Sequence, residues 1–189
     1  MKRKAVRALS AESVRKFSAG NIPYRRILVY GGTLFALALL QTTLLAHFPI
    51  LGVIPDLCLL FVLGIAMQDG REIGGAAGIC AGFLEGALGV AGPTALPILF
   101  FVVGYGTGLL SGRAIPRSFP SYLILSASLS VLRPAVTLAA IGLAAQTSAF
   151  DLTIILRGTL APEVLVNFLF SLPMYPLMRK IHSLAQKKV

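Results

Sequence analysis

Long apolar stretches separated by short polar connections make up the chain over residues 27–178. Six stretches can be marked, at about 27–48, 56–67, 73–90, 94–111, 121–145 and 152–178. An α-helix of about 20 apolar residues crosses the roughly 30 Å hydrocarbon layer of a bilayer. The alternating segments of about ten residues that are typical of a membrane β-barrel are absent from the sequence. The pattern therefore predicts an all-α polytopic membrane protein with six transmembrane helices.

Two of the six stretches differ from a simple membrane-spanning helix. The second is short, so we expect that it starts before Pro55, lies where the bilayer is thin, or has its backbone covered by protein. Asp56, directly after Pro55, is expected to cap the start of this helix. The sixth is longer than a bilayer requires and contains Pro162, Pro173 and Pro176, which predict a tilt or a kink.

The basic residues lie almost entirely on one side of this predicted topology. Fifteen of the 17 Lys and Arg residues fall in the segment 1–26, in the connections after the second and fourth stretches, or after residue 178. Positively charged connections stay in the cytoplasm. We therefore expect a basic cytoplasmic arm (1–26), a six-helix transmembrane domain (27–178) and a basic cytoplasmic tail (179–189), with both termini cytoplasmic.

Composition supports the same class. Hydrophobic residues make up 56% of the 189, mean hydropathy is +0.83, and charged residues are only 13%, whereas soluble domains carry about 25% charged residues. The net charge of +10 raises the possibility of a nucleic-acid partner. No basic face with interleaved aromatic residues accompanies it, so no nucleic acid is expected. The amino-terminal arm is expected to attract anionic lipid headgroups instead.

Glycines recur every four residues in two of the stretches. Gly74, Gly78, Gly82 and Gly86 do so in the third, and Gly104, Gly108 and Gly112 in the fourth. This spacing places small residues along one helix face, where helices in lipid can approach closely. The favoured interpretation is tight packing between these two helices, and the alternative is a seam for a partner's helix.

Four charged residues interrupt the apolar stretches: Glu85, Arg133, Arg157 and Glu163. A charge inside a membrane is costly unless it is paired. By depth, Arg133 is expected to pair with Glu163, and Arg157 with Glu85, which should face protein. Structural ion pairs are the favoured interpretation. A polar cavity or proton path and a counter-charge from a partner helix remain open.

Reactive chemistry has little support in the sequence. The motifs of metalloproteases, nucleotide-binding loops and serine hydrolases are absent, as are paired acids at catalytic spacing. Cys58 and Cys80 fall in apolar stretches and are expected to be small apolar filler. His47 and His182 lie at the ends of stretches and receive no role. We expect no enzyme activity, no cofactor and no metal.

Several motifs, taken in order, resemble the rod shape-determining membrane protein MreD family. They are Pro55-Asp56-Leu57, the GxxxGFxxG segment at 78–86, Gly92 with Ala95-Leu96, Gly104-Tyr105 with Gly108, and Pro162-Glu163-Val164 with Asn167, Pro173 and 177–180. The resemblance covers about 41–182. The chain lacks the acid that the family often carries after GFxxG, and Ala161 replaces the arginine often seen before the PEV motif.

The resemblance implies a non-enzymatic membrane scaffold of the complex that elongates the lateral cell wall and regulates peptidoglycan synthesis in rod-shaped bacteria. Its partner would be the transmembrane helix of MreC, and indirectly MreB, RodA and a class B penicillin-binding protein. The fold it implies is similar to the six-helix membrane subunit of energy-coupling-factor vitamin transporters.

Two other functions remain open. A small-molecule-binding subunit of a vitamin transporter needs a polar pocket near the outer face, whereas the outer connections are short and poor in polar groups. A lipid-handling enzyme or flippase would need catalytic groups, or a groove open to lipid beside Arg133.

Overall fold

The computed structural model describes residues 24–88, 96–112, 114–132, 134–135, 158 and 160–186, and the helices in these ranges form an all-α fold. The order is α2 (Tyr24–Leu39), the π-helix η1 (Leu40–Leu45), α3 (Leu57–Asp69), α4 (Arg71–Ala87), α5 (Leu96–Leu110), α6 (Phe119–Ser130) and α9 (Ala161–Gln186). No strand forms in the described ranges, where the β-type pairing is limited to two isolated bridges.

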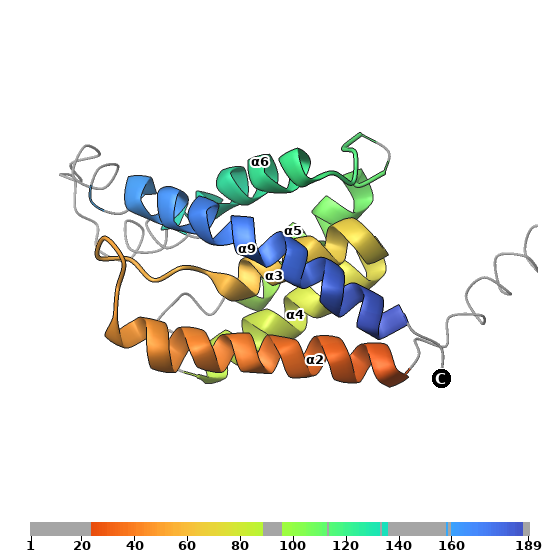
Figure 1. The fold of residues 1–189 in the computed structure, drawn as a ribbon, viewed down its shortest axis with the longest axis horizontal. Helices are drawn as coiled ribbons and strands as arrows, with labels where there is room; N and C mark the ends of the chain where they lie inside the picture. The colour runs from red at the N-terminus through yellow and green to blue at the C-terminus, as the bar shows by residue number, and fades with distance from the viewer. Residues whose placement is uncertain are drawn as a thin grey trace, which may run out of the picture.

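The described α-helices alternate in direction along the bundle (Figure 1). The starts of α2, α4 and α6 and the ends of α3, α5 and α9 lie at one end, on the right in Figure 1. This end is called the basic end. Its described basic residues are Arg25, Arg26, Arg71, Arg117, Arg179 and Lys180. The arrangement agrees with the alternation that the apolar stretches predict.

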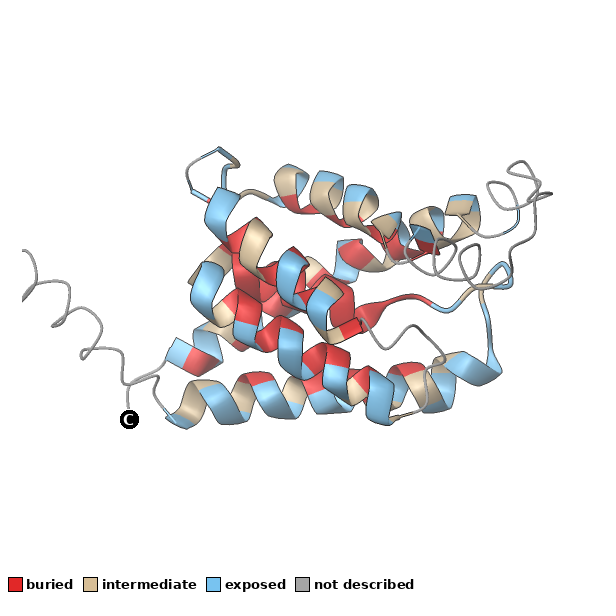
Figure 2. Ribbon diagram, turned by 180° about the vertical axis from the view of Figure 1, so that it is seen from behind, coloured by how far each residue is buried: buried red, intermediate tan, exposed pale blue. Residues whose placement is uncertain are grey.

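Helix α3 lies at the centre and packs against α2, α4, α5, α6 and α9. Every residue from Leu57 to Met67 is buried, and Figure 2 shows the buried residues gathered in the interior of the bundle. A helix that is apolar all round is stable only where it is enclosed on every side. Of the three expectations for the short second stretch, a backbone covered by protein is the one that this helix matches.

The outer surface of the bundle is also apolar. Every described α-helix except α3 exposes large apolar side chains, such as Phe35, Phe83, Val102, Ile124 and Leu169. By length and composition, the helical segment Tyr24–Leu45 could cross a membrane, and it is the one described segment that meets this criterion. Helices α3, α5 and α6 are apolar but shorter.

The carboxy-terminal helix extends past the predicted end of the transmembrane domain at residue 178. Helix α9 continues to Gln186, with Ile181 and Ala185 buried against the core. Residues 179–186 therefore continue the last helix, and their placement as a cytoplasmic tail stays a prediction. The apolar stretch ended at Met178 in the sequence because Arg179 and Lys180 follow it, but helical packing does not stop where a membrane-like composition stops. The helix also runs through Pro173 and Pro176.

Candidate functional site

A cluster of buried polar side chains surrounds the start of α3. It consists of Gln41 from η1, Asp56 before α3, Glu85 from α4 and Asn167 from α9, and is called the α3 cluster. All four residues are buried, and Asp56, Glu85 and Asn167 have no exposed surface. Four elements that are distant in sequence thus contribute polar groups to one place inside an otherwise apolar core.

The α3 cluster satisfies the backbone N–H groups at the start of α3. The first four N–H groups of any helix lack partners within the helix. Here the N–H of Asp56 donates to Asn167 Oδ1 at 2.7 Å. Gln41 Oε1 accepts from the N–H groups of Leu57 at 2.9 Å and Cys58 at 3.4 Å.

The cap is completed by Asp56 itself. Its Oδ1 accepts from the N–H of Leu59 at 2.9 Å, so the predicted helix cap is present. The first bond to a backbone carbonyl within the helix follows, from Leu60 N to Asp56 O at 3.2 Å. A helix can therefore begin in the interior without unpaired N–H groups, each of which would cost about 1–3 kcal/mol.

The π-helix η1 contains Gln41, which occupies a buried position next to α3. One turn of π-helix widens the backbone, and such turns occur often at functional sites. No role is predicted for Gln41 from the sequence, although a lone amide inside the apolar segment 34–45 is a signal that could have indicated a buried polar site. Gln41 Nε2 also donates to Glu85 Oε1 at 3.2 Å, so one side chain joins α3 to α4.

The intramembrane charges predicted from sequence are only partly described. Glu85 is buried and faces protein, as expected. Glu163 lies half-buried in the first turn of α9. Arg133 and Arg157 lie outside the described residues, so the pairings of Arg133 with Glu163 and of Arg157 with Glu85 remain predictions.

A second polar network closes the basic end. Asp69, at the end of α3, has a side chain only 4% exposed and lies 3.6 Å from Arg26 Nη1. Tyr30 OH donates to Asp69 Oδ2 and lies 2.9 Å from His182 Nδ1. His182 Nδ1 is also 3.3 Å from Asp69 Oδ2, and its Nε2 lies 2.8 Å from Gln186 Nε2. Helices α2, α3 and α9 are thus tied together at this end.

No role is predicted for His182 or Asp69 from the sequence alone, where His182 only marks the end of an apolar stretch. Their contact depends on α9 extending past Met178 and on α3 reaching the basic end, which only the packed structure shows.

The glycine faces of α4 and α5 pack against each other. A Cβ added at Gly78 would collide with the carbonyl of Phe100, and one at Gly104 with the carbonyl of Gly74. Gly82 lies against Pro97 in the same way, and Gly108 against Arg71. Such close approach of backbones is possible only for glycine. The seam between the glycine faces is therefore occupied by α4 and α5 themselves.

Two glycines of the predicted stripes do not lie in this seam, which corrects the sequence interpretation. A Cβ added at Gly86 would meet no described atom within 4 Å. Gly112 follows the end of α5 and has a φ of +81°, a conformation that favours glycine. The spacing of four residues between Gly108 and Gly112 therefore does not place both on one helix face, because the helix ends before Gly112.

The described part of the chain contains an apolar groove and a polar cavity large enough to consider as binding sites. An apolar groove between α6 and α9, of about 630 Å³, is lined by Ala127, Val131, Leu160, Ala161, Val164, Leu165 and Phe168. A polar cavity of about 290 Å³ at the basic end is lined by Gln68, Arg117, Tyr175, Arg179 and His182. Within the described residues, no three His, Cys, Asp or Glu side chains form a group that could hold a metal ion.

Comparison with known proteins adds no identification. No protein family model matches the chain. No curated protein and no solved structure matches it significantly.

Proposed function

We propose that this chain is a six-span membrane scaffold of the MreD type, which binds the transmembrane helix of MreC and thereby regulates lateral peptidoglycan synthesis. The proposal is of a binding protein without enzyme activity, in the bacterial inner membrane with both termini cytoplasmic.

The observation that carries the proposal is the convergence of the resembling motifs. Asp56 belongs to the Pro55-Asp56-Leu57 motif, Glu85 to the glycine-rich motif and Asn167 to the last one. In the fold all three belong to the α3 cluster, where Asn167 bonds to Asp56 directly. Motifs that resemble a family in sequence thus depend on one another in structure, which supports a shared architecture.

A membrane setting is supported by two features of the bundle. Soluble monomers rarely expose large contiguous apolar patches, whereas every described outer helix of this chain exposes large apolar side chains. The alternating helices also place the described Lys and Arg residues at one end, as the positive-inside rule requires of spanning helices. Helix α3 needs no full span of its own, because irregular backbone within a membrane is tolerated where protein covers it.

A partner's transmembrane helix would need a surface other than the glycine seam. The seam between α4 and α5 is occupied by these two helices. The described residues that line the groove between α6 and α9 are all apolar, and Ala127 and Ala161 among them are small. Small residues let a second helix approach closely and gain packing energy in lipid. We assign the MreC helix to this groove.

The test is co-purification with tagged MreC in mild detergent. The unmodified chain should retain MreC. Ala127→Trp fills the groove and should abolish retention, whereas Ile124→Trp changes an exposed residue of the same helix outside the groove lining and should retain MreC. Failure of the folded, unmodified chain to retain MreC would refute the scaffold. Retention of MreC by both variants would refute only the assignment of the MreC helix to the groove.

A further inference from the structure

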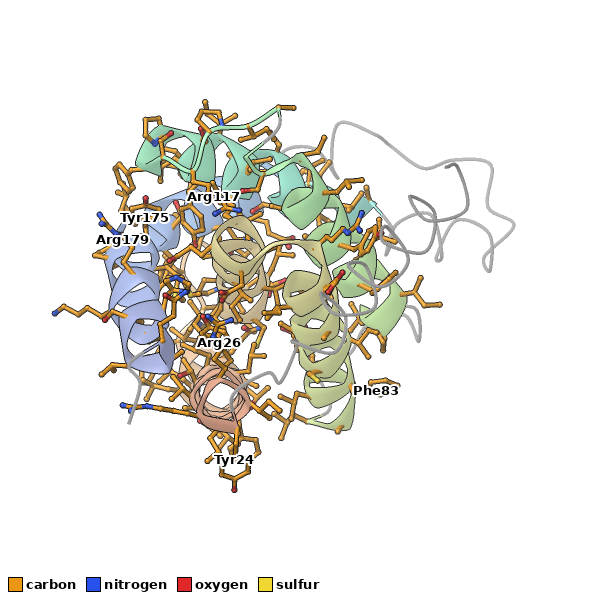
Figure 3. All side chains as sticks on the ribbon, turned by 90° about the vertical axis from the view of Figure 1, so that its right-hand side faces the viewer. Tyr24, Arg26, Phe83, Arg117, Tyr175 and Arg179 are labelled. Atoms are coloured by element: carbon orange, nitrogen blue, oxygen red, sulfur yellow. The ribbon has the colours of Figure 1, made fainter. Side chains whose placement is uncertain are left out.

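The polar cavity at the basic end lies where three segments meet. Gln68 comes from the end of α3, Arg117 from the turn before α6, and Tyr175, Arg179 and His182 from α9. Figure 3 looks at this end of the bundle and shows Arg117, Tyr175 and Arg179 close together between α6 and α9. The cavity has a volume of about 290 Å³, near the lower limit for small-molecule sites.

The charge of the cavity is positive. Arg117 and Arg179 contribute guanidinium groups, and the described residues that line the cavity include no carboxylate. Within the part of the chain that the structure describes, neither arginine forms an ion pair. The nearby carboxylate of Asp69 contacts Arg26, Tyr30 and His182. It therefore does not neutralise the two arginines.

The walls of the cavity are held by contacts outside it. Arg117 Nε donates to Ser111 Oγ at 3.4 Å, which helps to position the guanidinium. The ring of Tyr175 packs between Phe119, at 5.1 Å, and Tyr122, at 5.3 Å between centroids. Tyr122 OH in turn donates to the carbonyl of Leu60 at 2.9 Å. A rigid wall lowers the entropy lost when a ligand binds.

We propose that this cavity binds a phosphate group, and that the phosphate belongs to the headgroup of an anionic lipid. Guanidinium groups bind phosphate oxygens in pairs of parallel hydrogen bonds. Tyr175 and Gln68 add uncharged polar groups for the remaining oxygens. Basic pockets between helices on the cytoplasmic side of membrane proteins are suited to anionic headgroups. The lipid source rests on the membrane placement proposed above, whereas the phosphate site rests on the cavity alone.

The test measures lipid binding to the purified, delipidated chain by native mass spectrometry in neutral detergent. Phosphatidylglycerol should bind at least about tenfold more tightly than phosphatidylcholine, whose choline cation opposes the two arginines. The double variant Arg117→Gln/Arg179→Gln should bind phosphatidylglycerol about 10- to 100-fold more weakly. The control Arg71→Gln/Lys180→Gln removes the same charge from the same end outside the cavity and should bind normally.

Three results would overturn the inference. Equal losses in the two double variants would show attraction to general surface charge. Equal binding of the two lipids would remove the preference for an anionic headgroup. Displacement of phosphatidylglycerol by an equal concentration of inorganic phosphate would identify a free anion as the ligand and refute the lipid source.

Two further choices keep the test decisive. If the double variant does not fold, Arg179→Gln alone is used, because it removes no described hydrogen bond or ion pair and should therefore fold. It should still weaken binding about tenfold. MreC is absent from the assay, so loss of MreC retention and loss of lipid binding are separate results, and either proposal can fail alone.

Discussion

Asn167 Oδ1 accepts a hydrogen bond from the backbone N–H of Asp56 at 2.7 Å, across 111 positions of sequence. The bond joins the last helix to the start of the central one. It lies in a region without exposed surface, where water cannot replace a lost partner. The α3 cluster is therefore expected to contribute to stability as a unit.

Replacing Asn167 tests this dependence. Asn167→Leu should lower the free energy of unfolding by about 1–3 kcal/mol, because it leaves the Asp56 N–H buried without an acceptor. The measurement is reversible unfolding in mixed micelles of mild detergent and dodecyl sulfate, followed by helical circular dichroism. Ser171→Ala is the control on the same helix, since its hydroxyl bonds only to Phe168 O within α9. Equal effects of both variants would contradict the role of the cap.

The glycine seam offers a matched pair of substitutions. Gly78→Ala should destabilise the protein by about 1–3 kcal/mol or more, because the new Cβ collides with the backbone carbonyl of Phe100. Gly86→Ala lies on the same helix with no described atom within reach of the Cβ. It should be neutral, or stabilise the helix by about 0.5–1 kcal/mol. The same unfolding assay measures the stability of both variants. Lower stability of Gly86→Ala together with unchanged stability of Gly78→Ala would contradict the close packing at Gly78.

The network at the basic end predicts a cost for losing one hydroxyl. Tyr30→Phe removes the hydrogen bond to Asp69 and the contact with His182. It should lower the free energy of unfolding by about 1–3 kcal/mol, since the acceptor is a largely buried carboxylate. Tyr24→Phe changes an exposed tyrosine of the same helix and should change stability by less than about 0.5 kcal/mol. An unchanged free energy of unfolding for Tyr30→Phe would show that the buried carboxylate of Asp69 does not need this hydrogen bond.

Cysteine labelling tests the proposed membrane topology. In a background with Cys58→Ala and Cys80→Ala, single substitutions are made at Leu51, Phe83 and Gln186. In intact spheroplasts, a membrane-impermeant maleimide should label position 51 and spare 186, which should react only after lysis. Position 83 should stay unlabelled in both states, although Phe83 is exposed on the outer face of α4 (Figure 3), because lipid excludes the thiolate that reacts.

Two labelling results would contradict the proposed topology. Reaction at position 83 in membranes would place the outer face of α4 in water and refute a lipid-embedded bundle. Reaction at position 186 in intact spheroplasts would place the carboxy-terminal helix end outside the cytoplasm and refute the proposed orientation. A cysteine at Lys180, on the basic end, serves as a second site for the same comparison.

The local sequence pattern predicted the order of the described helices and part of the α3 cluster. The apolar stretches predicted the described helices in order, Asp56 was expected as a cap, and Glu85 was expected to face protein; α3, α4 and the cap geometry agree with this. These features depend on hydrophobic periodicity and on residues a few positions apart, which a single sequence contains.

Tertiary structure alone decided which groups meet. It brought Gln41 to the N–H groups of Leu57 and Cys58, and His182 to Asp69. It also filled the glycine seam from within and left Gly86 and Gly112 outside it. Such contacts depend on the rotation and depth of each helix relative to its neighbours. Packing among distant segments determines both, so no local spacing along the chain could have revealed them.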